Sequence, residues 1–433
     1  MAWRTEIYSG WGRALSATGD VARPERASAL ETLPAAPARG QGRSYGDACL
    51  NDAGRIIDMS RLDRILGFEG GLLHVEAGAR LGEIARIFAP QGWLPPVMPG
   101  TGFATVGGAI ANDVHGKNHH HAGTFGQHVS EITLRFQGKT KRLRPENPLF
   151  KATIGGLGQT GTIVAAKLKM TAIAGQAMQV RERRMAGWEE FVAELSSSLA
   201  PYSVGWIDAT ARGAALGRGI LEEGEIAQAS APGAKKAKKA KKIPFNAPSI
   251  ALAPPIVRAF NAAYLRRVPA SGRTVMRAFD DFFFPLDRIH DWNRLYGKRG
   301  FHQFQCVVPM ASEGALKDML ALIAGAGRAS PLAVLKRLGP GRGGAMSFPM
   351  EGLTLAVDMP ASQATEEIIA RLEDMTLEAG GRIYLAKDAL SSAATIDAMY
   401  PERAAWAATV AKADPAGALE TDLTRRLELR RVP

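Results

Sequence analysis

Residues 107–129 read GGAIANDVHGKNHHHAGTFGQHV, and this stretch holds five of the chain's eight histidines among five glycines. Glycine has no Cβ, so the backbone can approach a ligand closely, and successive N–H groups in tight turns can hold an anion. A zinc site is the alternative, because His115 and His119 would share one face of a helix. Gly116 argues against a helix there. We therefore interpret the stretch as a turn pressed against a ligand and predict no metal; solvated loop histidines remain a further alternative.

Two further segments have the same glycine-rich character: ARGQGRSYGD at 38–47 and GGLGQTGTI at 155–163. Each is a candidate cradle for a phosphate or a cofactor, although one such segment alone is a weak signal. Gly156, Gly158 and Gly161 also spell the GxGxxG pattern of a Rossmann fold. That pattern opens a helix, whereas the TIVAAKLKM that follows it is β-branched and alternating. The sequence therefore does not predict a Rossmann fold.

The composition is that of a soluble globular protein. The chain has 433 residues, of which 46% are hydrophobic and 22% charged, so two domains are the default expectation. No apolar run reaches the length of about eighteen residues that crosses a bilayer, and the first residues lack the pattern of a signal peptide. We expect a cytoplasmic protein. Cys49 and Cys306 are the two cysteines and lie far apart, so neither a disulfide scaffold nor a zinc ribbon is expected.

The positive charge is unevenly distributed. The net charge is +12, and the six lysines of AKKAKKAKKIP, between 234 and 244, account for half of it. Such a run attracts an anionic membrane surface, at about 1 kcal/mol for each basic residue near the lipid. The alternative is a solvated loop that aids solubility. Nucleic-acid binding is not expected, because no aromatic residues alternate with the lysines to stack on bases.

The hydrophobic pattern predicts an α+β fold. Leu81, Ile84 and Phe88 share one face of a predicted helix. From about 177 onwards, candidate strands at wide spacing alternate with helices, which indicates a second, antiparallel sheet covered by helices. Residues 223–275 form an insertion rich in Ala, Pro and Lys, predicted to be a loop or mobile lid. In the first part, the β-rich runs that predict strands are 55–60, 72–78, 131–137 and 161–173.

The three glycine-rich segments together resemble the FAD-binding domain of the vanillyl-alcohol oxidase type flavoenzymes, and within that group the decaprenylphosphoryl-β-D-ribose 2'-oxidase family. The second half of the chain supports the match with DWNRLYG, FHQFQCVVP, LAVLKRLGP and GRIYLAKDA. The resemblance runs from about residue 5 to 430. It implies an FAD-binding domain of two subdomains that begins in 1–176 and a substrate (cap) domain in 177–381. It also implies a carboxyl-terminal segment, 382–433, that returns to the FAD domain.

The resemblance also implies the residues that contact FAD. In many relatives a histidine of the first loop is covalently bonded to the flavin; Arg43 stands in the corresponding place, so non-covalent FAD is expected. Tyr384 is expected to touch the cofactor from the returning segment. The implied contacts on the three loops are Arg39, Gly40, Gln41, Gly42, Arg43, Ser44, Tyr45, Gly46, Gly100, Thr105, Val106, Gly107, Gly108, Asn112, His115 and Ile163.

Oxidation of a secondary alcohol with FAD needs a proton acceptor and positive charge near the reduced ring. Lys387 in YLAKD matches the family's active-site lysine and is expected to supply the charge. His115 is the predicted proton acceptor, because an imidazole titrates near neutral pH, and Lys387 is the alternative. The alternative for a lysine at this place is an exposed surface residue. The predicted substrate-binding residues are Lys117, Gln303, Gln305, Lys336 and Asn293.

Two of these residues also follow from local pattern. Gln303 and Gln305 lie two residues apart on a predicted strand and therefore share a face, although an exposed strand face is the alternative. Lys336 could meet a phosphate as a point charge. The chain departs from the family at Thr354 and Ala356, where some members carry asparagine and cysteine, so the sugar and lipid preference stays open.

The resemblance implies oxidation of the 2'-hydroxyl of a polyprenylphosphoryl-β-D-ribose to the 2'-keto sugar. This is the first half of an epimerisation to the arabinose form for cell-envelope polysaccharide synthesis. A separate NAD(P)H-dependent keto-sugar reductase, a quinone acceptor and a peripheral position on the inner face of the plasma membrane are the implied partners and location. The alternatives are a soluble FAD-dependent aldonolactone or carbohydrate oxidase, and a non-catalytic flavin-binding protein of the membrane surface.

Overall fold

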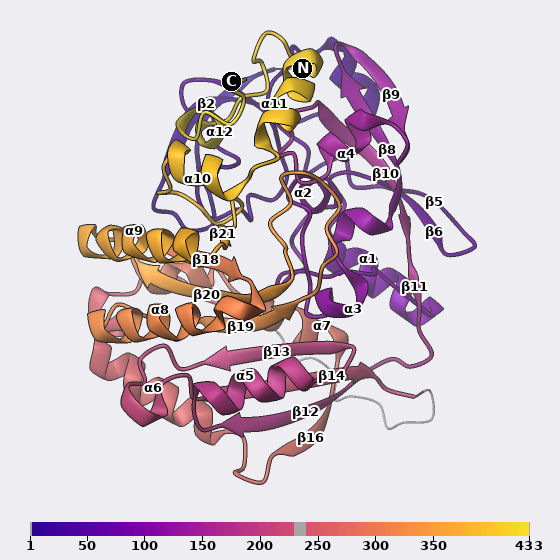
Figure 1. The fold of residues 1–433 in the computed structure, drawn as a ribbon. Coiled ribbons are helices and arrows are strands. Elements are labelled where there is room, and N and C mark those ends of the chain that lie inside the picture. The colour runs from indigo at the N-terminus through magenta and orange to yellow at the C-terminus, as the bar shows by residue number, and fades with distance from the viewer. Residues whose placement is uncertain (1, 229–239, 433) are drawn as a thin grey trace.

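The first part of the chain forms two small sheets (Figure 1). The computed structural model describes residues 2–228 and 240–432. One sheet has the order β1-β2-β4-β3 and consists of β1 (Arg4–Ser9), β2 (Ser16–Ala22), β3 (Ala38–Arg39) and β4 (Arg55–Asp58). The other has the order β5-β6-β10-β8-β9 and consists of β5 (Ile65–Glu69), β6 (Leu72–Glu76), β8 (Val129–Phe136), β9 (Lys139–Leu143) and β10 (Thr162–Lys169).

Helices α1 (Leu81–Phe88), α2 (Val106–Ala111) and α4 (Pro148–Thr153) accompany the second sheet. The predicted helix is confirmed: Leu81, Ile84 and Phe88 are buried in the core of this sheet. The segment after the GxGxxG pattern forms β10, which is antiparallel to both β6 and β8. The rejection of a Rossmann fold is therefore also confirmed. A short pair, β7 (Trp93–Leu94) and β11 (Thr171–Ala172), lies beside this sheet.

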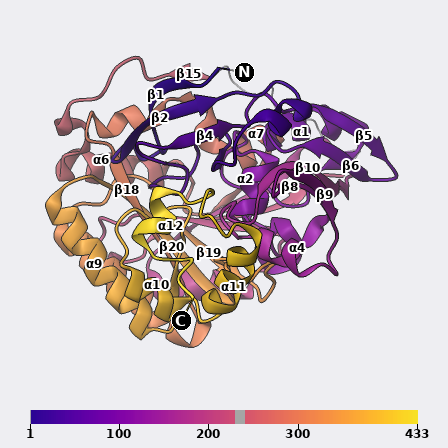
Figure 2. The same cartoon turned by 90° about the horizontal axis from the view of Figure 1, so that it is seen from above.

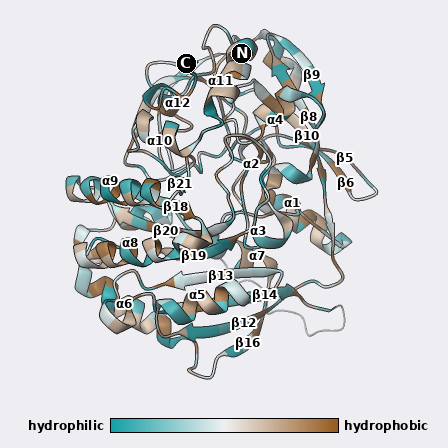
Figure 3. Ribbon diagram, viewed as in Figure 1, coloured by the Kyte–Doolittle hydropathy of each residue, from teal (hydrophilic) through white to brown (hydrophobic). Residues whose placement is uncertain are grey.

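The second part is built on one large antiparallel sheet, as predicted. Its strand order is β16-β12-β14-β13-β19-β20-β18-β21, and helices α5 (Trp188–Ser197), α8 (Glu313–Ala326) and α9 (Gln363–Glu378) cover it (Figure 1). Colouring by hydropathy shows both hydrophobic and hydrophilic stretches on α8 and α9 (Figure 3). The strands are β12 (Met178–Met185), β13 (Tyr202–Ile207), β14 (Gly219–Ile226), β16 (Arg273–Arg277), β18 (Phe301–Val308), β19 (Ala333–Leu338), β20 (Gly352–Pro360) and β21 (Arg382–Ile383).

The insertion differs from its prediction as a loop. Residues 229–239 lie outside the described residues, but helix α6 (Pro254–Arg266) and strand β16 are both present within 223–275. Pro254 and Pro255 occupy the first turn of α6, where proline is well tolerated. Val257 and Asn261, four residues apart, are its buried side chains. The loop prediction was wrong for these two elements because the Ala and Pro bias obscured that spacing.

The segment that follows the insertion runs from α7 (Phe279–Phe283) to the 3-10 helix η7 (Trp292–Tyr296). Strand β15 (Lys241–Lys242) of the insertion and strand β17 (Ile289–His290) of this segment, each two residues long, pair in parallel and join the two stretches. The insertion also contains the 3-10 helix η5 (Ser249–Leu252), and this segment contains the 3-10 helix η6 (Pro285–Arg288). No helix within the described ranges is long and apolar enough to cross a membrane.

After β21 the chain leaves the large sheet and returns to the first part. Helices α10 (Ala393–Met399), α11 (Arg403–Ala413) and α12 (Asp422–Arg426) overlie the strands of the large sheet when seen from above (Figure 2). Trp406 Nε1 donates a hydrogen bond to the Ala152 carbonyl at 3.0 Å, and Arg426 pairs with Asp47. These contacts are with the first part, and Tyr400 and Trp406 also belong to the core cluster of the large sheet, so the carboxyl-terminal segment contacts both parts.

Candidate active site

A row of polar side chains lies on the face of the large sheet opposite the helices. Gln303 on β18 is opposite Asp358 on β20, and Lys336 on β19 is opposite Thr354. Paired residues of antiparallel strands project to the same side, and alternate residues share a face. Gln305 therefore lies on this face as well, and its Nε2 is 3.3 Å from Thr354 Oγ1. The structure thus brings three predicted substrate-binding residues together.

The returning segment meets the first glycine loop directly beside this row. The Tyr45 N–H donates to the Ala386 carbonyl at 2.9 Å. A Cβ placed on Gly46 would overlap the Asp388 carbonyl oxygen, so only glycine allows this approach. Lys387 Nζ then lies 3.4 Å from the centre of the Tyr45 ring, which is a cation–π contact. The lysine predicted to be catalytic is therefore held on a residue predicted to contact FAD.

Asp358 is the acidic partner of Lys387 across the site. Burial, supplemented by repulsion from Lys336, lowers the pKa of Lys387 to about 7, while Asp358 acts in the opposite direction. Burial also raises the pKa of Asp358 to about 7. Its carboxylate accepts a hydrogen bond from Gln303 Nε2 and lies 3.3 Å from the Tyr296 hydroxyl. Both groups can therefore gain or lose a proton near neutral pH.

His115 follows α2, whose N-cap Thr105 accepts a hydrogen bond from Gly108 N at 3.2 Å. The His115 Nε2 is 3.4 Å from Gln305 Nε2, and its ring centre is 5.4 Å from that of Tyr384. Burial, together with nearby cationic side chains, holds the pKa of His115 well below its ordinary value. The imidazole is neutral at neutral pH and is a weak base. This differs from the ordinary titration on which its predicted role as proton acceptor was based.

Two further lysines bring positive charge to the site. Lys117 Nζ donates to the Phe282 carbonyl and lies 4.1 Å from the centre of the Phe282 ring. Burial lowers the pKa of Lys117 and of Lys336 to about 8, and the charge of Lys117 adds to the effect on Lys336. Neither forms an ion pair with any carboxylate in the described part of the chain. Two partly buried ammonium groups of this kind suit an anionic ligand such as a phosphate.

His119 and His120 of the opening stretch pack against the protein, whereas His121 is exposed. His119 begins the short helix α3 (His119–Ala122), and its Nδ1 accepts a hydrogen bond from Gly339 N at 3.0 Å. His120 Nε2 is 2.9 Å from the Ala200 carbonyl. Among the residues that the structure describes, no group of three or more His, Cys, Asp or Glu side chains is arranged to hold a metal ion.

The first glycine loop (38–47) also touches the second, which is the stretch around the start of α2 that contains Thr105, Gly107 and Gly108. A Cβ on Gly40 would overlap Thr105 Oγ1, so the two loops lie against one another. The Arg43 guanidinium lies between two rings, 3.9 Å from the centre of Trp11 and 4.3 Å from that of Phe103. Asn293 donates through its side-chain amide to the Trp11 carbonyl at 3.0 Å. The structure therefore places Asn293 beside the first loop, and not in the polar row with the other predicted substrate-binding residues.

These loops fit a bound dinucleotide. Four buried polar atoms on them have no partner within the described residues: Arg39 Nε, Arg43 Nε, Asn112 Oδ1 and His115 Nδ1. All four belong to residues predicted to contact FAD, and buried polar atoms require partners. Of the remaining predicted contacts, Ile163 is buried in β10, whereas Gly100 is exposed. The first two loops would hold FAD, with Tyr384 reaching them through a hydrogen bond from its hydroxyl to the Asn112 carbonyl at 3.4 Å.

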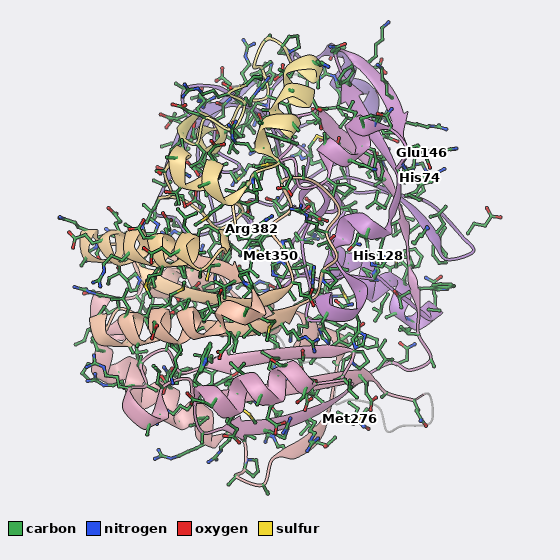
Figure 4. The ribbon with its side chains drawn as sticks, in the orientation of Figure 1. His74, His128, Glu146, Met276, Met350 and Arg382 are labelled. Atoms are coloured by element: carbon green, nitrogen blue, oxygen red, sulfur yellow. The ribbon has the colours of Figure 1, made fainter. Side chains whose placement is uncertain are left out.

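Sequence reasoning missed three members of the site. Asp358 and Tyr296 form the hydrogen-bonded pair described above, and the Phe348 ring stacks on Tyr384 with ring centres 4.5 Å apart. Met350, labelled in Figure 4, packs against the cluster that contains Phe348. Asp358 could have been found from its spacing of two and four residues from Ala356 and Thr354 on one strand.

Comparisons with known proteins agree with this site. A family model described as an FAD binding domain matches residues 33–143. The chain is 36% identical to the decaprenylphosphoryl-beta-D-ribose oxidase of Mycolicibacterium smegmatis, over 98% of both proteins. It is 30% identical over 81% of its length to an uncharacterized protein in the mprA 5' region of Streptomyces coelicolor, which is covered completely (100%).

A more distant relative matches less of the chain. The D-arabinono-1,4-lactone oxidase of Kluyveromyces lactis is 26% identical over 30% of this chain and 26% of its own length. The predictions of an α+β flavoenzyme fold, of FAD as cofactor and of an FAD-dependent oxidoreductase are confirmed. The similarity along almost the entire length decides the family. The chain belongs to the decaprenylphosphoryl-β-D-ribose oxidase family of FAD-dependent oxidoreductases.

Proposed function

We propose that the protein oxidises the 2'-hydroxyl of a polyprenylphosphoryl-β-D-ribose to the 2'-keto sugar, as the first half of an epimerisation to the arabinose form. The observation that carries this proposal is the position of Lys387, held on Tyr45 and facing the row of Gln303, Gln305 and Asp358. Non-covalently bound FAD supplies the acceptor for the hydride from the carbinol carbon. The partly buried Lys117 and Lys336 supply charge for the substrate's phosphate.

The proton of the 2'-hydroxyl goes to Lys387 Nζ. Because its pKa is lowered to about 7, a large part of Lys387 is the neutral amine at neutral pH and can accept a proton. The ammonium formed in this way then supplies positive charge where negative charge develops. His115 is a weaker base because its pKa is held well below the ordinary value, so it orients Gln305 and the sugar.

Anaerobic bleaching of the flavin by a short-chain prenylphosphoryl ribose tests this assignment. Lys387→Ala is expected to slow bleaching on the order of 100-fold or more, the scale of losing one well-placed electrostatic group. Lys412→Ala, which removes an exposed lysine of α11, is the matched control and is expected to bleach like the wild type. Equal bleaching in Lys387→Ala and wild type would contradict the role of Lys387.

The same assay separates the two alternative functions. A soluble aldonolactone or carbohydrate oxidase would be reduced by free lactones or sugars as well as by the phosphosugar. The partly buried Lys117 and Lys336 favour the phosphosugar, because a neutral lactone leaves both ammonium groups without an anion. A non-catalytic flavin-binding protein would stay yellow with every substrate.

The proposed substrate also implies partners and a location. A keto sugar is the substrate of a carbonyl reduction, so a separate NAD(P)H-dependent keto-sugar reductase would complete the epimerisation. The two electrons have to leave the protein, and we propose a membrane quinone as their acceptor. A lipid-linked sugar is held at a membrane, so the proposed location is cytoplasmic and peripheral, on the inner face of the plasma membrane.

A further inference from the structure

The segment around α6 has an extreme charge. Between Glu225 and Asp280 the sequence contains eleven Lys and Arg and no Asp or Glu. Arg267, Arg273 and Arg277 are used inside the protein, where they surround the buried Glu182. Apart from Arg273, the exposed basic residues of this region in the described ranges are Lys241, Lys242, Arg258, Arg266 and, after η7, Lys298 and Arg299; of these, Lys242 pairs with Asp291 at 3.6 Å. The surface of this region therefore carries an excess of positive charge.

Helix α6 turns an apolar stripe to the outside. Its inner side is fixed to β13 by Asn261, whose amide donates to Asp208 at 2.7 Å, and by Tyr264, whose ring lies against Trp206. Ile256 and Phe260, one helical turn apart, remain 46% and 50% exposed. This pattern is the reverse of an ordinary surface helix, which keeps its apolar stripe on the protein.

The stripe continues onto the neighbouring 3-10 helices. The Ala247 N–H donates to the Arg294 carbonyl at 2.8 Å, which joins the chain before η5 to η7. Of the twelve large hydrophobic side chains that are exposed in the described ranges, five lie on α6, η7 and the chain between β15 and α6. They form a patch and are not isolated exposed residues. We call them the α6 surface: Phe245, Ile250, Ile256, Phe260 and Leu295.

The α6 surface is connected to the active site through one aromatic cluster. Leu252 of η5 packs against the cluster of Trp292, Tyr296 and Phe301, and Tyr45 packs against the same cluster. Tyr45 is the residue on which Lys387 is held. Arg13, close to the first loop, adds a hydrogen bond to Asn246 at 2.8 Å. The α6 surface and the reaction centre therefore pack against the same aromatic cluster.

We infer that the α6 surface docks on a bilayer that contains anionic lipid, with its apolar side chains in the interface and the surrounding Lys and Arg at the headgroups. Apolar side chains flanked by basic residues are the chemistry of interfacial attachment. The uniform positive charge of the segment favours anionic lipid over a protein partner of mixed charge. The inference rests on the proposed function in one respect: a polyprenyl-linked substrate gives the attachment its purpose.

Vesicle sedimentation of the FAD-loaded protein tests the inference. The probes are vesicles of phosphatidylcholine alone and vesicles of phosphatidylcholine with phosphatidylglycerol. Wild type is expected to bind the anionic vesicles, more weakly as salt is raised, and to ignore the neutral ones. Ile256→Glu/Phe260→Glu is expected to lose at least ~10-fold in affinity, since burying two carboxylates at an interface is unfavourable. Arg258→Glu, a charge reversal on the same helix, is expected to weaken binding as well.

The matched control is Leu66→Glu. Leu66 is 46% exposed on β5, which lies on the opposite side of the molecule from α6 in both views (Figures 1 and 2). This variant is expected to bind anionic vesicles like the wild type. The flavin of every variant should be bleached by the short-chain substrate in solution as in the wild type. A failure of the proposed function would appear in this assay, whereas a failure of the membrane inference would appear only in vesicle binding. Equal vesicle binding by wild type and Ile256→Glu/Phe260→Glu, or no binding by wild type, would overturn the inference.

Discussion

Asp358 and Lys387 set the protonation of the reaction centre as a pair. Asp358 is buried and Lys387 is partly buried, and burial moves both pKa values towards about 7, the lysine downwards and the aspartate upwards. Gln303 and Tyr296 hold the Asp358 carboxyl group in one position. The charge of one therefore depends on the other, and Asp358 controls how much neutral Lys387 amine is present.

The pH dependence of flavin reduction follows from this pair. If the Lys387 amine accepts the substrate proton, the rate of anaerobic reduction should rise with pH and be half-maximal near pH 7, where the lysine titrates. Asp358 raises the pKa of Lys387, so Asp358→Asn should lower that pKa and move the profile to lower pH. Stopped-flow absorbance between pH 5 and 9 measures this, with Asp374→Asn on the outer side of α9 as control. A profile of unchanged position but lower rate would argue against proton transfer to Lys387.

Part of this centre could be predicted from the sequence. Gln303 and Gln305 were placed on one face by their spacing alone, and the register of β18 with β20 puts them beside Thr354 and Asp358. Asp358 was missed because it follows a run of apolar residues, and burial of its carboxylate depends on a strand distant in sequence. The low pKa of His115 likewise depends on packing by Tyr384 and other distant side chains.

The contact between the first loop and the returning segment depends on one missing side chain. Gly46 faces the Asp388 carbonyl so closely that a Cβ cannot be accommodated, and the neighbouring Tyr45 is hydrogen-bonded to Ala386. The backbone at Gly46 and at Asp388 is buried, so neither segment can shift without moving Lys387. The glycine therefore sets the distance between the FAD loops and the catalytic lysine.

Gly46→Ala should separate these two segments. We expect a loss of stability of about 1–3 kcal/mol, the usual cost of overpacking, and a clear fall in the FAD content of the purified protein. Gly67→Ala is the matched control, because a Cβ at Gly67 meets nothing within 4 Å. Urea unfolding and the ratio of flavin to protein absorbance measure the two effects. Equal FAD content in both variants would show that the close approach does not position the loop.

Helices α1 and α6 show which elements can be predicted from sequence. In α1, Leu81, Ile84 and Phe88 form a buried stripe, so the pattern and the packing agree. In α6 the buried face is narrow and partly polar, and the outer face carries Ile256 and Phe260. A helix whose apolar residues face outwards has no ordinary amphipathic pattern, so the segment was interpreted as a loop. The outward-facing Ile256 and Phe260 obscured the helical pattern, and the same two side chains suggest attachment to a membrane.

Arg426, in the carboxyl-terminal segment, joins the first loop to the residue that directly follows Lys387. Its guanidinium binds Asp47, at the end of the first loop, at 2.8 and 2.9 Å, and Asp388, directly after Lys387, at 2.9 Å. Both carboxylates are almost fully buried, with 5% and 2% of their side chains exposed. Arg426 lowers the pKa of Asp388 against the effect of burial. One guanidinium of α12 thus pairs with two buried carboxylates, one at the end of the first loop and one directly after Lys387.

Replacing Arg426 by methionine should therefore destabilise the protein strongly. Removing one partner of a buried ion pair costs about 3–5 kcal/mol, because the remaining charge is left without compensation. In the wild type the pKa of Asp388 is depressed, so its stabilising contribution is present above the unfolded-state pKa and is lost as pH falls through the folded value. The difference between variant and wild type should thus persist from pH 7 down to about pH 4 and shrink only below the ordinary aspartate pKa of 3.8, towards about pH 3.

Urea unfolding of Arg426→Met across that pH range measures the difference, and the rate of FAD release shows whether the first loop loosens with it. Arg431→Met is the control, because Arg431 is 75% exposed and pairs with Glu428 at the surface, so we expect a change of at most about 1 kcal/mol. If the two variants lose the same stability, or if the loss in Arg426→Met does not change with pH, the ion pairs of Arg426 do not join the first loop to the residue after Lys387. A loss of stability with unchanged FAD release would place the effect of Arg426 on α12 alone, away from the first loop.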